Sequence, residues 1–262
     1  MILAVDVGNS NTTVGLFNGT GELLFRALLE TSRSKTRDQC AIELLGVFQL
    51  YGADACTVDG AILSSVVPAL TTIFTDAIAR LTGIPPMVVG PGIRTGLNIK
   101  AEIHNQLGSD IVASSVAAIA KYPSPIVMVD MGTATSLSLI VGSVYEGCII
   151  MPGLALALDA LSERAAALPP ISIETASPVG LMGHTTEEAM RSGVLYGHAS
   201  MVDGMLERIE ESIGQSVTTV ATGGNAPRIL RYCKRPIQYD ADLIMTGLYL
   251  LYQKNAKKYR KA

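Results

Sequence analysis

The sequence predicts an α/β protein made of two similar halves around a cleft. Three expected strands, followed by helices that alternate with strands, occur twice along the 262 residues. A short motif also occurs in both halves, since residues 5–12 (VDVGNSNT) correspond to residues 129–136 (VDMGTATS). The motif has the same place in each series of elements. The pattern therefore indicates a duplicated fold, with one domain over residues 1–120 and a second over residues 121–262.

The first half opens with three expected strands joined by Gly- and Asn-containing turns that are typical of β-hairpins. Apolar spacing, glycines after the last turns and an entry through Pro68 predict the helices that follow. The strands are expected at residues 1–7, 12–17, 22–29, 60–66 and 87–89, and the helices at 37–51, 69–81 and 110–122.

The second half repeats this order from Pro125 onward, again with three strands before the first helix. Its strands are expected at residues 126–130, 136–141, 144–150 and 217–221, and its helices at 154–166, 186–213, 226–232 and 241–254.

Composition excludes several classes of function. The formal charge of −3 and the pI of about 5.6 give no indication of a nucleic-acid or membrane partner. The four cysteines are scattered, without metal-ligand spacing. The N-terminus lacks a basic leader, and the longest apolar stretch, residues 126–144, has strand-like alternation rather than the pattern of a membrane span. We therefore expect a cytoplasmic protein.

The first repeated turn has the chemistry of a phosphate site. Asp6 ends an apolar strand, and residues 8–13 offer closely spaced N–H and hydroxyl donors. Asp6 is also suited to hold magnesium, which takes one or two carboxylates with water and substrate phosphates. A plain exposed hairpin, whose aspartate only ties down its turn, is the alternative. The second copy, with Asp130 and Thr133, argues against that alternative.

A strand also leads into a double-glycine turn at Gly223 and Gly224 before a helix. The absence of side chains there lets a base or ribose approach the backbone, although many such turns are only turns. The phosphate-loop pattern G-x-x-x-x-G-K-[ST] is missing, which excludes the P-loop kinases. The loop at residues 90–96 has the wrong glycine spacing for a dinucleotide fingerprint.

Six motifs in order resemble the type III pantothenate kinases, over essentially the whole chain. They are Asp6-x-Gly8-Asn9-Ser10-Asn11, Gly108-Ser109-Asp110, Asp130-x-Gly132-Thr133-Ala134-Thr135, residues 147–153 (GCIIMPG), Met190-Arg191-Ser192-Gly193 and Thr222-Gly223-Gly224. The family belongs to the superfold of actin, Hsp70 and the sugar kinases. The resemblance therefore implies a duplicated ribonuclease H-like (actin-like ATPase) fold.

The resemblance also implies phosphorylation of pantothenate by ATP to 4′-phosphopantothenate, the first step of coenzyme A biosynthesis. It implies magnesium, a monovalent cation (potassium or ammonium), and a homodimer whose partner helps to wall the acceptor pocket. Carried over by motif, the ATP-binding residues are Asp6, Val7, Gly8, Asn9, Ser10, Asn11, Thr12, Thr13, Thr133, Gly223 and Gly224.

The resemblance assigns the remaining roles as follows. Asp6 holds magnesium and Asp130 the monovalent cation, while Asp110 takes the proton from the substrate hydroxyl. A structural helix start is the alternative for Asp110. The substrate-binding residues are Gly108, Ser109, Asp110, Ile111 and Thr186, with Thr185 leaving the register of the last open by one.

Two positions depart from the family pattern on the acceptor side. Ile111 stands where the family has an arginine that reads the pantothenate carboxylate, and Ala101 stands where it usually has a tyrosine. Lys100 or Arg94 could supply the missing charge. Three hypotheses stay open: a pantothenate kinase with an altered pocket, a kinase of the same fold acting on another hydroxylated acceptor, and a nucleotide-binding regulatory relative without catalysis.

Overall fold

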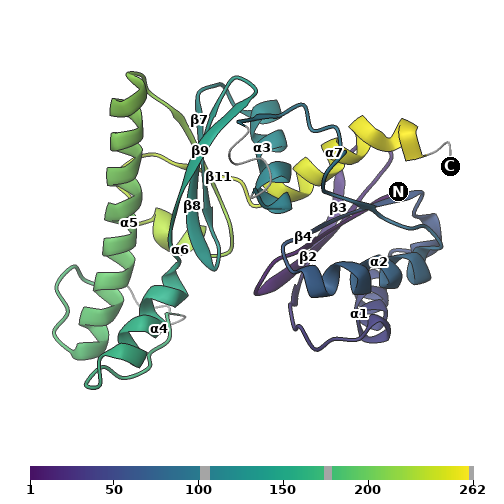
Figure 1. Cartoon of the computed structure of the whole chain (residues 1–262). Coiled ribbons are helices and arrows are strands. Elements are labelled where there is room, and N and C mark those ends of the chain that lie inside the picture. The colour runs from purple at the N-terminus through teal and green to yellow at the C-terminus, as the bar shows by residue number, and fades with distance from the viewer. Residues whose placement is uncertain (101–106, 174–178, 260–262) are drawn as a thin grey trace. The chain divides into compact units, whose positions relative to one another are not determined.

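A computed structural model describes residues 1–100, 107–173 and 179–259, and the chain divides into two compact units (Figure 1). The first unit comprises Met1–Ala120 together with Asp242–Ala262, and the second comprises Lys121–Ala241. Each unit contains a mixed β-sheet with helices packed on it.

The first unit has a sheet with the strand order β3-β2-β1-β4-β5. The first three strands are antiparallel neighbours, whereas β4 and β5 run parallel to β1. The strands are β1 (Ile2–Val7), β2 (Asn11–Phe17), β3 (Leu23–Glu30), β4 (Gly60–Ser65) and β5 (Met87–Val88). The other elements in this part of the sequence are α1 (Arg37–Leu50), the 3₁₀ helix η1 (Ala55–Thr57), α2 (Pro68–Thr82), β6 (Asn98–Ile99) and α3 (Ser109–Lys121).

Capping residues set where α1 begins and where α2 begins and ends. Thr36 caps α1 through a capping box with Gln39, which satisfies two of the backbone N–H groups at the helix start. Pro68 opens α2, and Gly83 ends it in the left-handed conformation that glycine adopts without strain.

Five strands of the second sheet repeat the topology of the first, in the order β9-β8-β7-β10-β11. Its antiparallel strands β7 to β9 are followed by β10 and β11, which run parallel to β7. The strands are β7 (Ile126–Met131), β8 (Ala134–Val141), β9 (Val144–Pro152), β10 (Thr218–Thr222) and β11 (Gln238–Tyr239), and the helices are α4 (Leu154–Arg164), α5 (Thr186–Ile213) and α6 (Ala226–Leu230). The predicted duplication is therefore confirmed.

The last helix, α7 (Leu243–Tyr259), belongs to the first unit. Its buried side chains Met245 and Leu248 share an apolar cluster with Ile2 of β1. The backbone of α7 also approaches α3 closely, since a Cβ on Gly247 would lie 1.9 Å from the carbonyl oxygen of Ala113. The expected second half ran on to residue 262, and the structure differs because this packing assigns the helix to the first sheet.

Most other expected elements lie within a few residues of their predicted bounds, and α5 has the bounds that its sequence pattern predicts. The elements that the sequence analysis missed are η1, β6 and β11, which are two or three residues long and too short to show a period. Within the described ranges, no helix combines the length and the apolar character that crossing a membrane requires.

Candidate active site

The first aspartate turn follows β1 as a tight hairpin. The N–H of Gly8 donates to the carbonyl oxygen of Asn11 at 3.0 Å, and a Cβ on Gly8 would lie 2.9 Å from that same oxygen. Glycine therefore lets the turn close. The side chains of Asn9, Ser10 and Asn11 are exposed, so the donors of this turn face solvent.

The first aspartate turn is held in place by hydrogen bonds with Thr31, the residue that follows β3. The N–H of Thr31 donates to the carbonyl oxygen of Ser10 at 3.0 Å, and the hydroxyls of Thr12 and Thr31 lie 2.8 Å apart. Thr12 is fully buried, and the side chain of Val7 lies in the apolar core. These two members of the expected phosphate loop therefore support its backbone, and Thr31 is a supporting residue that sequence reasoning missed.

Asp6 lies near the end of β1, at the centre of the sheet. It is 8% exposed and stands in register with Thr13 on β2 and with Ser64 on β4. Because β1 and β4 are parallel, their carboxyl ends meet at one edge of the sheet. Asp6 and Ser64 are thus neighbours on that edge.

The start of α3 is fastened to the same edge. The hydroxyl of Ser109 lies 2.9 Å from the hydroxyl of Ser64 and accepts the N–H of Ser65 at 3.1 Å. These bonds place Asp110, the second residue of α3, beside the strand that neighbours Asp6. The first unit therefore gathers the magnesium candidate and the base candidate at one sheet edge.

The carboxylate of Asp110 is held close to its own helix start. Its Oδ1 accepts the N–H of Ile111 at 2.8 Å, and a Cβ on Gly108 would lie only 2.3 Å from that oxygen. Glycine at position 108 leaves the room that the carboxylate occupies. Burial raises the pKa of Asp110, and the backbone N–H of Ile111 opposes this only in part. A raised pKa makes the ionised carboxylate a stronger proton acceptor.

The second aspartate turn is also closed by a glycine N–H, although it is one residue shorter than the first. The N–H of Gly132 donates to the carbonyl oxygen of Ala134 at 3.0 Å, and the side chain of Thr133 is exposed. Asp130 is half-buried and in register with Thr222, so the second turn and the double-glycine turn lie at one edge of the second sheet.

The backbone of the second turn is enclosed from two sides. A Cβ on Gly153 would lie 2.1 Å from the carbonyl oxygen of Thr133. On the other side, Asn225 donates its backbone N–H to Met131 at 3.0 Å and its side-chain amide to Gly132 at 3.2 Å. The exposed hydroxyl of Thr133 is therefore carried on a backbone with little freedom to move.

A buried pair stabilises the strand that leaves the second turn. The hydroxyl of Thr135 lies 2.9 Å from Nε2 of His198 on α5, and both residues are buried. Burial lowers the pKa of His198 and favours its neutral form. No sequence spacing links these two residues, so the analysis of the sequence alone missed their contact.

Comparison with known proteins decides the family. The family model described as type III pantothenate kinase matches residues 2–208. A type III pantothenate kinase of Exiguobacterium sp. is 38% identical over 258 residues, which are 98% of this chain and 100% of the relative. This chain belongs to the type III pantothenate kinase family.

Solved structures support the fold of this family member. A conserved putative Baf family transcriptional activator from Campylobacter jejuni aligns with a TM-score of 0.60 at 20% identity, covering 97% of this chain and 99% of its own. The activator of 2-hydroxyisocaproyl-CoA dehydratase from Clostridium difficile, with bound ADPNP, aligns with a TM-score of 0.58 at 11% identity, covering 99% and 97%. Likeness at such identities bears on the fold alone, and it confirms the predicted duplicated actin-like ATPase fold.

The acceptor side of this type III pantothenate kinase family member is described in part. Ile111 is half-buried in the first turn of α3, whereas Ala101 lies outside the described residues. Asn255 holds the backbone of Arg94 at both its N–H (2.9 Å) and its carbonyl oxygen (3.0 Å), and the Arg94 side chain is exposed. Lys100 is also exposed.

The two threonines at the start of α5 differ in what their hydroxyls do. The Thr185 hydroxyl accepts the N–H of Glu188 at 3.2 Å, as the N-cap of a capping box. Thr186 is the first residue of the helix and is exposed. Of the two, Thr186 is therefore the better candidate for a substrate contact.

The charged residues fit the expected ions in different ways. In the parts of the chain that the structure describes, no three His, Cys, Asp or Glu side chains gather as a metal site. A single carboxylate such as Asp6 nevertheless fits magnesium, because substrate phosphates and water supply its other ligands. Beside Asp130, Gly223 has a left-handed φ of 92°, and a Cβ there would lie 2.7 Å from Oδ1 of Asp130. Glycine thus leaves space next to this carboxylate, which fits a bound cation.

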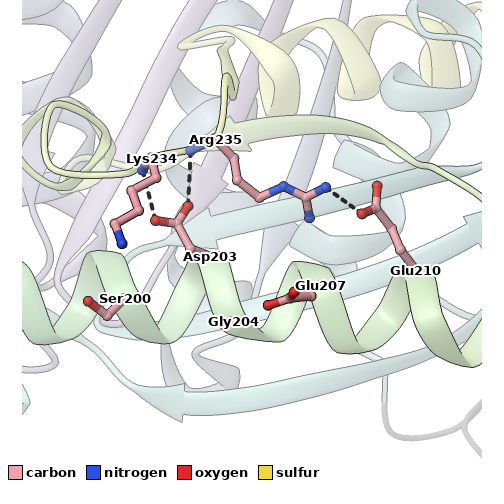
Figure 2. A pocket seen from close by; sticks show the side chains of 7 residues that line it. All are labelled: Ser200, Asp203, Gly204, Glu207, Glu210, Lys234 and Arg235. Carbon is pink, nitrogen blue, oxygen red and sulfur yellow. Dashed lines mark hydrogen bonds and ion pairs between the residues drawn. The ribbon is translucent and has the colours of Figure 1, made fainter.

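A hollow of about 480 Å³ in the second unit lies away from these residues, along α5 and the segment before β11 (Figure 2). Asp203 accepts the backbone N–H of Lys234 at 2.8 Å and that of Arg235 at 3.3 Å, and Arg235 forms an ion pair with Glu210. Hydrogen bonds to the backbone of Val217 and to Arg235 lower the pKa of Glu210. These polar groups bind one another, and none of the expected site residues lines the hollow.

Proposed function

We propose that this protein transfers the γ-phosphoryl group of ATP to the hydroxyl of pantothenate. The product is 4′-phosphopantothenate, and the reaction opens coenzyme A biosynthesis. One structural observation carries the proposal beyond family membership. The hydrogen bonds of Ser109 hold the candidate base, Asp110, at the sheet edge where Asp6 lies near the end of β1.

The geometry supports Asp110 as the general base. Its half-buried carboxylate has a raised pKa, which makes the ionised form a stronger proton acceptor, and its Oδ1 accepts the N–H of Ile111 at 2.8 Å. The substrate hydroxyl oxygen attacks the γ-phosphorus as its proton passes to Asp110, and the bond to the bridging oxygen of ADP breaks. The balanced products are ADP, the phosphate ester and a protonated Asp110, which then releases its proton to water.

The two aspartate turns are suited to bind the phosphate chain. The first supplies the exposed residues Asn9, Ser10 and Asn11, and the second supplies Thr133. In this proposal Gly223 and Gly224 admit the adenosine. Magnesium bound at Asp6, and a potassium or ammonium ion at Asp130, would neutralise charge on the phosphates.

A second candidate function follows from Ile111. An aliphatic side chain one residue after the base offers no charge to a carboxylate, and a carboxylate buried without a cation costs several kcal/mol. A kinase of the same fold acting on a different hydroxylated acceptor is therefore the alternative. Retention of Asp110 argues against a regulatory relative without catalysis, because such a protein has no need of a base.

We also propose a cytoplasmic homodimer. An apolar hollow on α5 supports the homodimer. It is lined by Gly193, Tyr196 and Gly197 together with Leu181 and Met182, whose side chains are 64% and 78% exposed. Side chains of this kind on a surface favour a protein partner. Light scattering after size exclusion should give twice the mass of the chain, and a monomer at micromolar concentration would contradict the proposal.

The test of function is ADP release by the purified protein with ATP and magnesium. Pantothenate should be compared with analogues that lack the carboxylate or carry a different hydroxylated chain, each in potassium, ammonium or sodium salt. We expect turnover with pantothenate that requires potassium or ammonium. Turnover only with an analogue that lacks the carboxylate would favour the second candidate, and no turnover with any acceptor would reject both.

A further inference from the structure

We propose that Ser109 is a positioning residue for phosphoryl transfer, whose hydroxyl fixes the Asp110 carboxylate relative to Asp6. The inference rests on the proposed function, because it takes Asp110 as the base. Family resemblance placed Ser109 among the substrate contacts. The contacts of its hydroxyl support a different role.

The hydroxyl of Ser109 uses its whole hydrogen-bonding capacity within the protein. It accepts the N–H of Ser65 at 3.1 Å, and it lies 3.2 Å from the carbonyl oxygen of Ser65 and 2.9 Å from the hydroxyl of Ser64. A hydroxyl has one donor hydrogen and two acceptor lone pairs. Since a carbonyl oxygen only accepts, Ser109 donates to Ser65 and the Ser64 hydroxyl donates to Ser109. Nothing remains for a substrate.

The partners of Ser109 belong to the strand next to Asp6. Ser64 is fully buried and stands in register with Asp6 on the parallel strand β1. The N–H of Val66 donates to the carbonyl oxygen of Val7 at 3.0 Å, which continues the pairing to the end of both strands. Ser109 thus joins the first residue of α3 to the backbone that carries the first aspartate turn.

Asp110 follows Ser109 directly, so a shift of the helix start moves the carboxylate with it. Consecutive Cα atoms are ~3.8 Å apart and the peptide between them is planar. The carboxylate also has little local freedom, because its Oδ1 is bound to the Ile111 N–H and lies 2.3 Å from the Cβ position of Gly108. Its place at the sheet edge therefore depends on where the helix start is anchored.

The first test is the kinetics of Ser109→Ala. A misplacement of about 1 Å costs on the order of 100-fold in rate, so we expect kcat to fall by roughly 10- to 100-fold. The KM for ATP should stay unchanged, because the phosphate turns are not altered. Ser64→Ala removes one of the three bonds and should cost less, about 2- to 5-fold. Ser109→Thr keeps the hydroxyl, so its kcat should be much closer to that of wild type than the kcat of Ser109→Ala.

Thr82→Val is the matched control in the same unit. The Thr82 hydroxyl has a similar set of partners: it accepts the N–H of Ile84 at 3.1 Å and lies 2.8 Å and 3.1 Å from the carbonyl oxygens of Ile78 and Ile84. It lies at the C-terminal end of α2, away from the sheet edge that carries Asp6. We expect this variant to melt at a lower temperature with wild-type kcat. A fall in kcat as large as that of Ser109→Ala would overturn the positioning role.

Hydrogen exchange gives a readout that does not need activity. The N–H of Val112 donates to Gly108 at 3.1 Å and that of Ile111 to Asp110, so both report on the helix start. We expect Ser109→Ala to speed their exchange at least tenfold and Thr82→Val to leave it unchanged. Unchanged exchange, or a wild-type kcat in Ser109→Ala, overturns the inference. If the wild-type protein phosphorylates no acceptor, the proposed function fails, and faster exchange in Ser109→Ala still supports the anchor.

Discussion

Gly153→Ala perturbs the second aspartate turn although no residue of the turn itself is substituted. Gly153 has φ −75° and ψ 172°, which alanine adopts without backbone strain. The new methyl group would lie 2.1 Å from the carbonyl oxygen of Thr133 and 2.7 Å from that of Gly132. Both contacts are with backbone atoms, so no side-chain rotation relieves them.

The magnitude follows from these distances. Separations below 3.0 Å essentially never occur for a Cβ, so the turn or the start of α4 has to move by about 1 Å. Such overpacking costs typically about 1–3 kcal/mol of stability, and a misplacement of about 1 Å costs on the order of 100-fold in rate. We therefore expect kcat to fall about 100-fold and the KM for ATP to rise, since the displaced turn carries Thr133.

The assay is ADP release at saturating acceptor with ATP varied, together with thermal melting. Gly147→Ala is the matched control, because it lies on the neighbouring strand β9 and a Cβ there has nothing within 4 Å. The control should keep wild-type kcat and KM. If Gly153→Ala is folded and keeps wild-type values for both constants, the second turn does not position ATP phosphates and the reasoning is wrong.

The remaining predictions concern the base and the acceptor side. Asp110→Asn should lower kcat by about 10²–10⁴-fold while calorimetry shows unchanged ATP affinity, and wild-type kcat/KM should fall as the pH drops through the raised pKa of Asp110. Because its pKa is raised in the folded state, Asp110 stabilises the protein most when it is protonated, and this contribution is lost as the pH rises through the folded pKa. Asp110→Asn should therefore have a higher melting temperature than wild type at pH 7 and the same melting temperature in acid. A lower melting temperature at pH 7 would contradict this. Ile111→Arg should lower the KM for pantothenate at least tenfold, about 1.4 kcal/mol, and should leave the KM for ATP unchanged. If the wild-type protein already binds pantothenate tightly and Ile111→Arg brings no gain, Lys100 or a partner subunit supplies the charge. Thr186→Val should raise the KM for pantothenate and leave the melting temperature unchanged. Thr185→Val should lower the free energy of unfolding by about 1 kcal/mol, because the helix cap is lost. The reverse pattern would reassign the substrate contact to Thr185.

The aspartate turns were open to prediction because their signals are local. Apolar strands with Asp6 and Asp130 as their second-last residues, each followed by a glycine turn, mark both turns within a few residues of sequence. The long helix α5 was equally clear, since Thr185 and Glu188 form a capping box and Gly214 ends it. Local chemistry of this kind does not depend on which sheet a segment joins.

The supporting contacts could not be predicted, because they join residues that are distant in the sequence. Ser109 meets Ser64 across 45 residues, and Thr135 meets His198 across 63. Hydroxyl groups and a histidine at such separations give no periodic signal. The pair Ser64-Ser65 at the end of an apolar strand was the available hint, since hydroxyls at a strand end often bind the backbone of a neighbouring element.

The position of the last helix was also beyond sequence pattern. The apolar face of α7, which includes Met245 and Leu248, has helical spacing that suits either sheet. The sheet on which α7 packs depends on shape. Gly247 permits close approach to Ala113, whereas any side chain at position 247 would clash with the carbonyl oxygen of Ala113. Shape complementarity between distant segments has no signature in a single sequence.

The place of α7 in the first unit also has a consequence for the order in which the chain folds. Alternate residues of β1 face opposite sides: Leu3 and Val5 pack in one apolar cluster, while Ile2 and Ala4 pack in the cluster that α7 covers. On the ribosome β1 is made well before α7, and the whole second unit comes between them. At roughly 5–20 residues per second, the interval is on the order of tens of seconds. During that time this side of the nascent sheet has α3 but lacks α7, so it is the side on which we expect a chaperone to bind or a premature stop to cause aggregation.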